Sequence, residues 1–358
     1  MRIVAADVLP YALRFRDPYV TACGMLDRRE MVLLRLRTDD GIEGFGEAVP
    51  LALRGGATLR EVERTLHAAA GGLIGRELGD AAVPGGWQAP EGIPVPARAA
   101  LDIALQDIAA KAAGLPLWRF LGAERAGPVR CNATLVAAEP RAVAAQAAAW
   151  AQRGFASFKL KVGLPGDVAQ VEAARSELGD GARIRVDANG AWSVQAAIAK
   201  LAAMERFGIE LCEQPAPDLE DLAAVRAQTA VPIAADESVA APADARRALE
   251  LDACQLATVK LSKVGGIDTA RAIARTLPTY LSSALDGAVG LAAAAHLAQA
   301  LPSAGLAAHL AHGLATQLLF TDSIAAVECE LRGDLLTVPD GPGLGVEIDA
   351  RALQRCRL

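Results

Sequence analysis

The sequence is poor in the side chains that many enzymes use for proton transfer and metal binding. Its 358 residues include four histidines, of which only His309 and His312 lie close together. Six cysteines form no Cys-x-x-Cys pair and no cluster suited to zinc, so we interpret them as reduced, buried, small hydrophobic residues. Lysines and carboxylates are therefore expected to carry the acid–base chemistry of any active site.

Other absences limit the partners and the location of the protein. The net charge is −6 and no basic block is present, which argues against nucleic acid as a partner. No run of 18 apolar residues occurs, and the first residues lack the pattern of a signal peptide. We predict a cytoplasmic protein without a membrane partner.

The first third of the chain has an α+β pattern. Residues 31–37 and 42–48 flank an Asp-Gly turn at Gly41, which predicts a β-hairpin. Apolar periodicity predicts helices at 59–73 and 96–113, separated by a loop rich in proline and glycine at 79–96. With 53% hydrophobic residues, the chain can bury a large core, and its length allows two domains or a barrel with an attached module.

Beyond about residue 128, short apolar runs alternate with alanine-rich helical segments, a pattern typical of β-α units and a parallel sheet. One such helix is expected at 194–207, with Ser193 as its cap. The expected strands begin near residues 129, 158, 184, 209, 233, 257, 280 and 305.

Five ionisable residues each stand at the end of one of these runs. They are Lys161, Asp187, Glu213, Asp236 and Lys260, separated by steps of 26, 26, 23 and 24 residues. Such a spacing is typical of a TIM-like (β/α)8 barrel, in which the carboxyl ends of the strands converge on one mouth. We therefore expect these side chains to meet in a single cavity.

The three carboxylates of this set predict a metal site. Oxygen ligands on Asp187, Glu213 and Asp236 suit a hard cation, Mg2+ or alternatively Mn2+. The alternative for each carboxylate is an ordinary ion pair or a helix cap.

The lysines predict the proton chemistry. Lys159 and Lys161 alternate with apolar residues and so project from the same face of a strand; an exposed surface strand is the alternative. A lysine can act as a base near neutral pH when burial or a neighbouring cation lowers its pKa. We expect Lys161 to be the base, with its pKa lowered by Lys159 and by the metal ion. Lys260 would face Lys161 across the substrate.

Together these residues suit abstraction of a proton next to a carboxylate, because a divalent cation stabilises the second negative charge that develops. Two other classes of protein remain open at this point. A metal-free Schiff-base enzyme would use Lys260 as a nucleophile. A protein that binds carboxylates without catalysis would explain the cations, but not two lysines flanking a metal site.

The segments FKLKVG, RVDANG, CEQP, ADES and VKLSKVGG, which start at residues 158, 185, 212, 235 and 259, resemble the enolase superfamily in its muconate-lactonizing-enzyme subgroup. The resemblance covers nearly the whole chain. It implies an α/β fold with a (β/α)7β barrel at 126–325, an α+β capping domain at 1–125, and a tail at 326–358 that returns to the cap.

The resemblance also implies roles for single residues. Asp187, Glu213 and Asp236 would bind the metal, Lys161 would be the base with Lys159 beside it, and Lys260 would be the opposing lysine. Asn189 and Glu237 would support them, whereas Lys263 is interpreted as a surface lysine at a helix start.

Within the subgroup, segments at 129, 185 and 282 are most similar to o-succinylbenzoate synthases. The implied reaction is a lyase reaction through an enediolate, a syn dehydration in menaquinone biosynthesis. The alternative is an isomerase, a dipeptide epimerase or N-acylamino acid racemase. Dipeptide epimerases usually carry an Asp-x-Asp element where residues 281–287 contain only Asp286, which favours the synthase.

Substrate selection is expected in cap loops at 15–25 and 50–58, which would close over the barrel. Candidate contacts to a small carboxylate substrate are Arg14, Arg16, Tyr19, Arg54 and Ser283. The sequence is compatible with a homo-oligomer.

Overall fold

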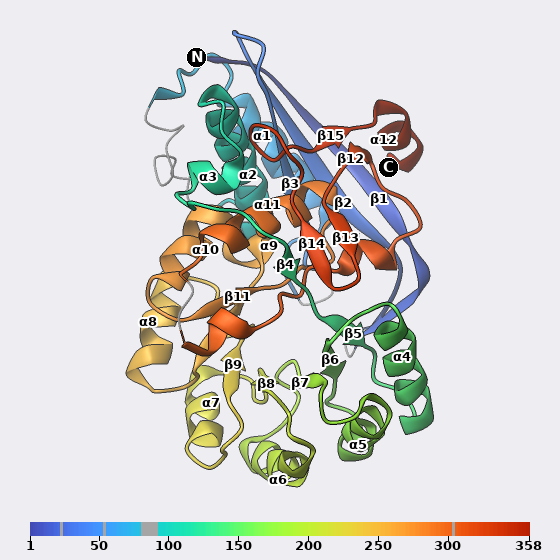
Figure 1. Ribbon diagram of the computed structural model, residues 1–358. Coiled ribbons are helices and arrows are strands. Elements are labelled where there is room, and N and C mark those ends of the chain that lie inside the picture. Colours follow the sequence, from blue (N-terminus) through green and yellow to red (C-terminus); the bar gives the residue numbers. More distant parts are fainter. Residues whose placement is uncertain (22–23, 53–54, 80–91, 303–304) are drawn as a thin grey trace.

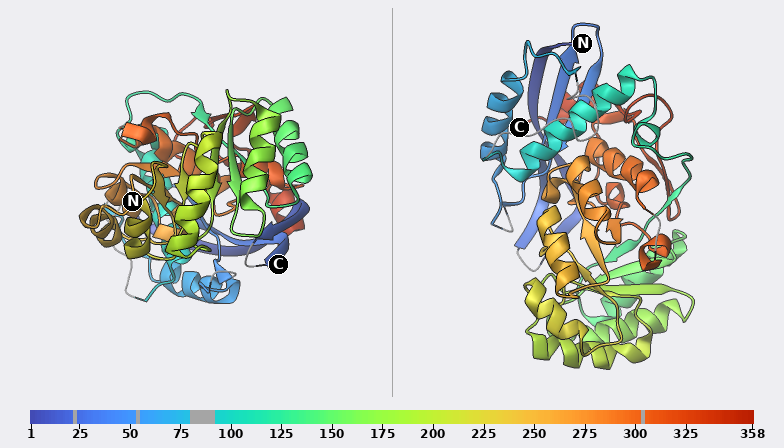
Figure 2. Two further views of the ribbon diagram at one scale, coloured as in Figure 1. Left: turned by 90° about the horizontal axis from the view of Figure 1, so that it is seen from below. Right: turned by 90° about the vertical axis from the view of Figure 1, so that its left-hand side faces the viewer.

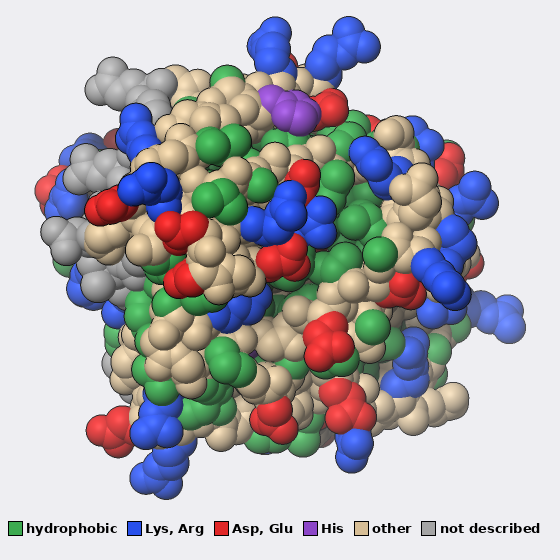
Figure 3. Space-filling view, turned by 90° about the horizontal axis from the view of Figure 1, so that it is seen from above, with side chains coloured by type: hydrophobic (Ala, Val, Ile, Leu, Met, Phe, Trp, Pro, Cys, Tyr) green, Lys and Arg blue, Asp and Glu red, His purple; other side chains and the backbone are tan. Residues whose placement is uncertain are grey.

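The computed structural model describes residues 1–21, 24–52, 55–79, 92–302 and 305–358 of the protein. An antiparallel sheet with flanking helices forms a cap, and a curved parallel sheet surrounded by helices forms a barrel (Figure 1 and Figure 2). On the face seen from above, acidic and basic side chains are interspersed (Figure 3). No helix in the described part of the chain is long and apolar enough to cross a membrane.

The capping sheet consists of β1 (Ile3–Thr21), β2 (Gly24–Thr38) and β3 (Glu43–Ala48), paired antiparallel in chain order. The predicted hairpin is confirmed, because β2 and β3 pair across a turn in which Gly41 has a φ of 85°. The loop expected at 15–25 is wrong for most of its length. There β1 and β2 extend as an arm: beyond an irregularity after Arg14, pairing resumes at Tyr19 with Leu26 and continues to Thr21 with Gly24, so backbone hydrogen bonds join the two strands.

The cap helices are α1 (Leu59–Gly71), α2 (Val95–Ala112) and the short α3 (Leu117–Phe120). The first two confirm the helices predicted from apolar periodicity. Most of the predicted loop at 79–96 lies outside the described residues. Helix α2 is buried along most of its length because it packs against the capping sheet on one side and barrel helices on the other.

The barrel repeats a strand and a helix along the chain (Figure 1). Its strands are β5 (Ala133–Leu135), β6 (Ser157–Lys161), β7 (Arg183–Asp187), β8 (Cys212–Glu213), β9 (Ile233–Ala235), β10 (Leu256–Val259) and β11 (Thr279–Leu281), paired parallel in that order. The helices are α4 (Pro140–Gln152), α5 (Asp167–Leu178), α6 (Val194–Met204), α7 (Leu219–Arg226), α8 (Pro242–Glu250), α9 (Leu261–Val264), α10 (Ile267–Ala274) and α11 (Ala288–Ala300). Ser193 caps α6 as predicted, with its hydroxyl accepting from the Ala196 amide at 3.3 Å.

The ring is closed by a short segment rather than by the strand expected at residue 305. Residues Gly305–His309 form a 3-10 helix, and the following residues form parallel bridges from His312 to Cys131 and from Gly313 to Ser282. The run GLAAHL contains no β-branched residue, so it has little preference for a strand. The closing segment completes a (β/α)7β barrel, the fold class that was expected.

The C-terminal residues return to the cap. They form β12 (Ala325–Val327), which pairs with β15 (Glu347–Ile348), and α12 (Ala350–Cys356). They also form β13 (Glu330–Arg332) and β14 (Leu335–Thr337), which pair with each other, and β14 pairs in addition with β4 (Val129–Arg130). The amide of Leu358 donates to the carbonyl of Pro10 on β1. The domain boundaries near residues 125 and 325 stay a prediction. The described thiols are free; Cys356 is half-buried, contrary to expectation, and the others are buried.

Candidate active site

The five residues that recur along the sequence lie at one end of the barrel. Lys161, Asp187 and Glu213 are the last residues of β6, β7 and β8, and the register places them side by side. Asp236 directly follows β9, and Lys260 directly follows β10. The strand periodicity thus brings together residues that are up to 99 positions apart in the chain.

Lys159 lies between two of the carboxylates. Its ammonium donates to both Glu213 oxygens at 2.7 Å and lies 2.8 Å from Asp187. Burial lowers the pKa of Lys159, but the attraction of Asp187 and Glu213 outweighs burial and raises it well above its usual value. Lys159 is therefore a fixed positive charge in the barrel interior.

Lys161 stands at the rim of the same group. Its ammonium lies 2.5 Å from Asp187 and donates to Asn189 Oδ1 at 3.0 Å. The amide of Asn189 in turn donates to Glu237 at 3.0 Å. Asn189 adopts a positive φ of 47°, which turns the chain so that both its backbone and side chain contact Asp187. The expected supporting residues are thus assembled around Lys161.

Asp236 is held by two lysines. Lys260 forms an ion pair with one of its oxygens, and Lys263 lies 2.8 Å from the other. Lys263 lies within the short helix α9, which begins at Leu261, and its interpretation as a surface residue is wrong. Its side chain is only 13% exposed, because the short helix α9 turns it back toward Asp236 and the carbonyl of Thr258. Lys263 therefore belongs to the site.

The three carboxylates are completely buried, and their pKa values diverge. Burial raises the pKa of Asp187, but Lys159 and Lys161 outweigh it and lower the pKa below its usual range. The same opposition, with Lys260 and Lys263 as the cations, lowers the pKa of Asp236. For Glu213, burial and the neighbouring Asp187 raise the pKa. Glu213 is thus the carboxylate with the least compensated charge.

A cavity of about 410 Å3 opens onto these groups. It lies between the cap and the barrel mouth, since Tyr19, Leu26, Arg29, Leu51 and Gly56 of the cap line it together with Lys161, Lys260 and other barrel residues. Lys161 and Lys260, the residues predicted to transfer protons, therefore face a cavity large enough to hold a small-molecule ligand.

The structure places some of the predicted substrate-contact residues in the cavity lining and others outside it. Tyr19 and Ser283 line the cavity, although the Ser283 hydroxyl is bonded to Asp286 at 2.7 Å. Arg14 and Arg16 are exposed and outside the lining, and Arg16 donates to the carbonyl of Leu318. The structure therefore does not bring these two arginines to the site. Arg54 lies outside the described residues.

Arg29 is a lining residue that sequence reasoning missed. Its guanidinium donates to the carbonyls of Pro50 and Ala284 at 3.0 Å, and so links the cap to the barrel. Asn132 was missed too; it is 2% exposed, lines the cavity and has a side-chain oxygen without a hydrogen-bond partner in the described structure. Neither residue ends a periodic apolar run, the signal by which the others were found.

The donor set suits a hard divalent cation. Asp187, Glu213 and Asp236 offer buried, negatively charged oxygens from adjacent strands, which is the chemistry that Mg2+ and Mn2+ prefer. As the side chains stand, ammonium groups separate them, and no three acidic, histidine or cysteine residues in the described part of the chain are grouped closely enough to hold an ion. A cation here would compete with lysines for the same oxygens.

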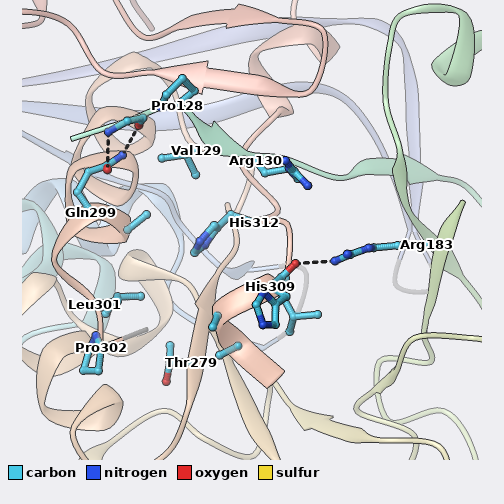
Figure 4. Close-up of a pocket in the computed structure, with 15 residues that line it drawn as sticks. Pro128, Val129, Arg130, Arg183, Thr279, Gln299, Leu301, Pro302, His309 and His312 are labelled. Carbon is cyan, nitrogen blue, oxygen red and sulfur yellow. Dashed lines mark hydrogen bonds between the residues drawn. The ribbon is translucent and has the colours of Figure 1, made fainter. Parts of the chain in front are cut away.

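A second cavity of about 410 Å3 contains none of the five residues (Figure 4). Its lining includes Arg183 and Thr279, the first residues of β7 and β11, so it lies at the end of the barrel opposite to the five residues. Its lining includes both residues of the close histidine pair, His309 and His312. His309 is exposed. His312 is buried, which lowers its pKa to about 4, and its Nδ1 accepts a hydrogen bond from the Leu281 amide. We assign the chemistry to the first cavity, because it joins the ionisable groups.

The family models match the chain in two parts. Residues 3–122 match the N-terminal domain of the mandelate racemase / muconate lactonizing enzyme family, and residues 142–352 match the domain described as enolase C-terminal domain-like. The chain belongs to the enolase superfamily. It falls in the muconate-lactonizing-enzyme subgroup, as the motifs indicated, and members of this superfamily are enzymes that abstract a proton next to a carboxylate.

Members of the enolase superfamily with different activities are similar to this chain. It is 32% identical to the D-Ala-D/L-Ala epimerase of Cytophaga hutchinsonii, over 83% of this chain and 84% of that enzyme. Identity to the L-Ala-D/L-Glu epimerase of Bacillus subtilis is 31%, over 97% of both chains. Identity to the o-succinylbenzoate synthase of Thermobifida fusca is 40%, over 51% of this chain and 59% of that enzyme.

Solved structures of the enolase superfamily share the whole fold. The N-succinyl Arg/Lys racemase from Bacillus cereus superposes with a TM-score of 0.93 at 27% identity, covering 100% of this chain and 98% of that one. The Cytophaga hutchinsonii epimerase, solved with Mg and the dipeptide D-Ala-L-Val, has a TM-score of 0.91 at 29% identity, covering 99% and 98%.

Proposed function

We propose that the protein is a racemase or epimerase that inverts the α-carbon of an N-acylated amino acid. The observation that carries this proposal is the placement of Lys161 and Lys260 on opposite sides of the buried carboxylates, both facing one cavity. Strands β7, β8 and β9 separate the strands that bear them. Inversion requires an acid and a base on opposite faces of one carbon, and two such lysines meet that need.

In the proposed reaction, Lys161 removes the α-proton from one face and Lys260 delivers a proton to the other. The attraction of Asp236 outweighs burial and raises the pKa of Lys260, which favours the ammonium form needed in a donor. For the opposite enantiomer the two lysines exchange roles. Asn189 and Asp187 hold the Lys161 ammonium by a hydrogen bond and an ion pair, which fixes the direction of the side chain.

Asp187, Glu213 and Asp236 would hold a Mg2+ ion, which would supply Lewis-acid stabilisation of the charge that develops on the substrate carboxylate. A relative of known structure was solved with Mg and a dipeptide, which supports this assignment. The cap residues Tyr19, Leu26 and Leu51 line the cavity and would help to exclude water from the reacting carbon.

The structure favours an acyl group without an ammonium. A dipeptide carries a charged amino group that needs an acidic partner. Dipeptide epimerases usually carry an Asp-x-Asp element at the position of residues 281–287, where this chain has the single acid Asp286. Asp286 is 5% exposed, is not part of the cavity lining, and already accepts from two serine hydroxyls and the Ala284 amide. An N-acylamino acid avoids this requirement, and the N-succinyl Arg/Lys racemase is among the relatives.

The test is α-proton exchange followed by NMR in D2O. Purified protein with Mg2+ is given N-succinyl, N-acetyl and dipeptide forms of several amino acids, each as a single enantiomer. We expect exchange and inversion for the N-acyl compounds, with dipeptides reacting more slowly. Absence of exchange with every compound would contradict the proposal.

The second candidate is the syn dehydration catalysed by o-succinylbenzoate synthases, favoured by the 40% identity to the Thermobifida fusca enzyme. Here Lys161 would take the proton and then protonate the departing hydroxide on the same face, while the Lys260 ammonium stabilises the enediolate. The two candidates separate in the Lys260 variant. Inversion cannot occur without a group on the second face, whereas a one-face dehydration retains its proton-transferring group.

A further inference from the structure

We propose that Tyr280 is a positioning residue that holds the Glu213 carboxylate for a divalent cation, and that Arg185 keeps the Tyr280 ring in place. This proposal rests on the metal site assigned above and goes beyond the roles of the five residues at the strand ends.

Tyr280 reaches Glu213 across the barrel interior. Its hydroxyl donates to Glu213 Oε2 at 2.5 Å, and the two side chains are 1% and 0% exposed. Tyr280 lies on β11 and Glu213 on β8, with β9 and β10 between them in the sheet. A contact between such strands can form only through the inside of the ring, where a long side chain spans the gap.

The Tyr280 ring is packed against a buried cation. The Arg185 guanidinium lies 5.2 Å from the ring centre, and Arg185 is fully buried. Its own position is fixed by an ion pair with Glu210 at 2.8 Å and a hydrogen bond to the Ala311 carbonyl at 2.9 Å. Arg185 precedes Asp187 by two residues on β7, so both side chains project to the same side of the strand.

The chemistry of a hydroxyl suits Glu213. Asp187 and Asp236 each pair with two lysines, whereas the one lysine that pairs with Glu213 in the described part of the chain is Lys159, which is shared with Asp187. A neutral hydroxyl orients a carboxylate without cancelling its charge, so that the charge stays available to a cation. Hydrogen-bond partners of metal ligands commonly change metal affinity by about 10–100-fold when they are removed.

The chain offers a matched control in Tyr11. It too is fully buried, and its hydroxyl donates to a buried glutamate, Glu47, at 2.7 Å. Glu47 belongs to β3 of the cap and is not among the residues that line the active-site cavity. Tyr11→Phe therefore removes a buried tyrosine hydroxyl of the same kind, but not a contact to a proposed metal ligand.

The experiment is calorimetric titration of metal-free full-length protein with Mg2+, without substrate, for wild type, Tyr280→Phe and Tyr11→Phe. We expect the Kd for Mg2+ to rise about 10–100-fold in Tyr280→Phe and less than twofold in Tyr11→Phe. Far-UV circular dichroism checks that all three proteins are folded.

An unchanged Kd in Tyr280→Phe would overturn the proposal, as would equal weakening in both variants, which would indicate general loosening of the fold. Wild-type protein that binds no Mg2+ would overturn the metal site together with this role. Because no substrate is present, the result is independent of whether the enzyme inverts N-acylamino acids. Arg185→Met should weaken Mg2+ binding in the same direction if it remains folded.

Discussion

At the scale of single residues, the site is a compact alternation of cations and anions. Lys159, Lys161, Lys260 and Lys263 surround three carboxylates that no solvent reaches. Isolated buried charges are costly, and the mutual pairing offsets much of this cost. The same ion pairs orient Lys161 and Lys260, the two lysines that face the cavity. The interactions that stabilise the site therefore also position its proton-transfer groups.

Replacing either facing lysine should slow inversion strongly. We expect Lys161→Ala and Lys260→Ala each to lower kcat for racemisation by about 10²–10⁴-fold, because general acid–base catalysis contributes about that much. In Lys260→Ala, the remaining lysine should still exchange the α-proton of one enantiomer with D2O without inverting it. Chiral chromatography and proton NMR on the same samples measure both processes.

Lys111→Ala is the control for these variants. Lys111 lies on α2, where it pairs with Asp107 at 2.7 Å, and is absent from the lining of the active-site cavity. Its replacement should leave kcat within about twofold of wild type. Full racemase activity in Lys161→Ala would contradict the assigned base.

At the scale of elements, the cap depends on a close approach between β3 and α2. Gly44 and Gly46 alternate along β3 and face α2. A Cβ added at Gly46 would lie 1.8 Å from the Ala100 carbonyl oxygen, and one at Gly44 would lie 2.4 Å from that of Ala104. Glycine is required here because the helix backbone itself occupies the space of a side chain.

Gly46→Ala should therefore destabilise the protein. Overpacking usually costs about 1–3 kcal/mol, and a collision with backbone allows little relaxation, so we expect the upper end of this range. Urea unfolding measures the change in the free energy of unfolding. Gly181→Ala is the control, because no atom lies within 4 Å of an added Cβ there, and it should differ from wild type by less than about 0.5 kcal/mol.

The joint between the cap sheet and α11 contains a buried carboxyl. Glu47 of β3 accepts from the Tyr11 hydroxyl and from the Gly287 amide at the start of α11. Burial, together with the nearby Asp286, raises the pKa of Glu47 from 4.5 to about 7. Folding therefore favours the protonated form, so this contribution to stability is complete below pH 4.5 and is lost as the pH rises through about 7.

Glu47→Gln should remove this pH dependence, because glutamine stays neutral. We expect the variant and wild type to be similarly stable at pH 5, and the variant to be more stable by up to about 3 kcal/mol at pH 8, since each pKa unit corresponds to about 1.4 kcal/mol. Urea unfolding at both values measures this difference. Glu139→Gln, at an exposed position, should show none. Parallel pH profiles of wild type and Glu47→Gln would contradict the assignment.

At the scale of the whole molecule, the cavity is formed jointly by the N-terminal cap and the barrel. The arm of β1 and β2 supplies Tyr19, Leu26 and Arg29, whereas the barrel supplies the ionisable residues. Helix α2 joins the two parts, since Asp107 accepts from the Phe45 amide in the cap sheet and Asp102 accepts from the Ile267 amide at a barrel helix. The cavity is therefore complete only when the cap and the barrel are packed against each other.

Metal removal should affect both activity and global stability. We expect EDTA to stop α-proton exchange and Mg2+ to restore it. Since a ligand stabilises the folded state that binds it, Mg2+ at 100 times its Kd should add about 2.7 kcal/mol to the free energy of unfolding, which calorimetry detects as a higher Tm. Substrate trapping by borohydride that persists in chelator would instead indicate a Schiff-base enzyme at Lys260.

Much of the site could be predicted because a parallel barrel converts a sequence period into a position in space. Each of Lys161, Asp187, Glu213, Asp236 and Lys260 follows an apolar run, so the period alone places them at one rim. Lys263, Arg29 and Tyr280 have no such signal. Their positions depend on how a short helix turns, how the cap docks, and how wide the barrel interior is.

The superfamily, the barrel, and the set of lysines and carboxylates follow from residues that are close together in the chain, because strand periodicity and local motifs are encoded there. The exclusion of Arg14 and Arg16 from the cavity, the burial of Asp286 and the contact between Tyr280 and Glu213 depend instead on how the chain packs in three dimensions. These contacts join segments that are distant in the chain. Their geometry follows from packing between elements, which no local pattern specifies.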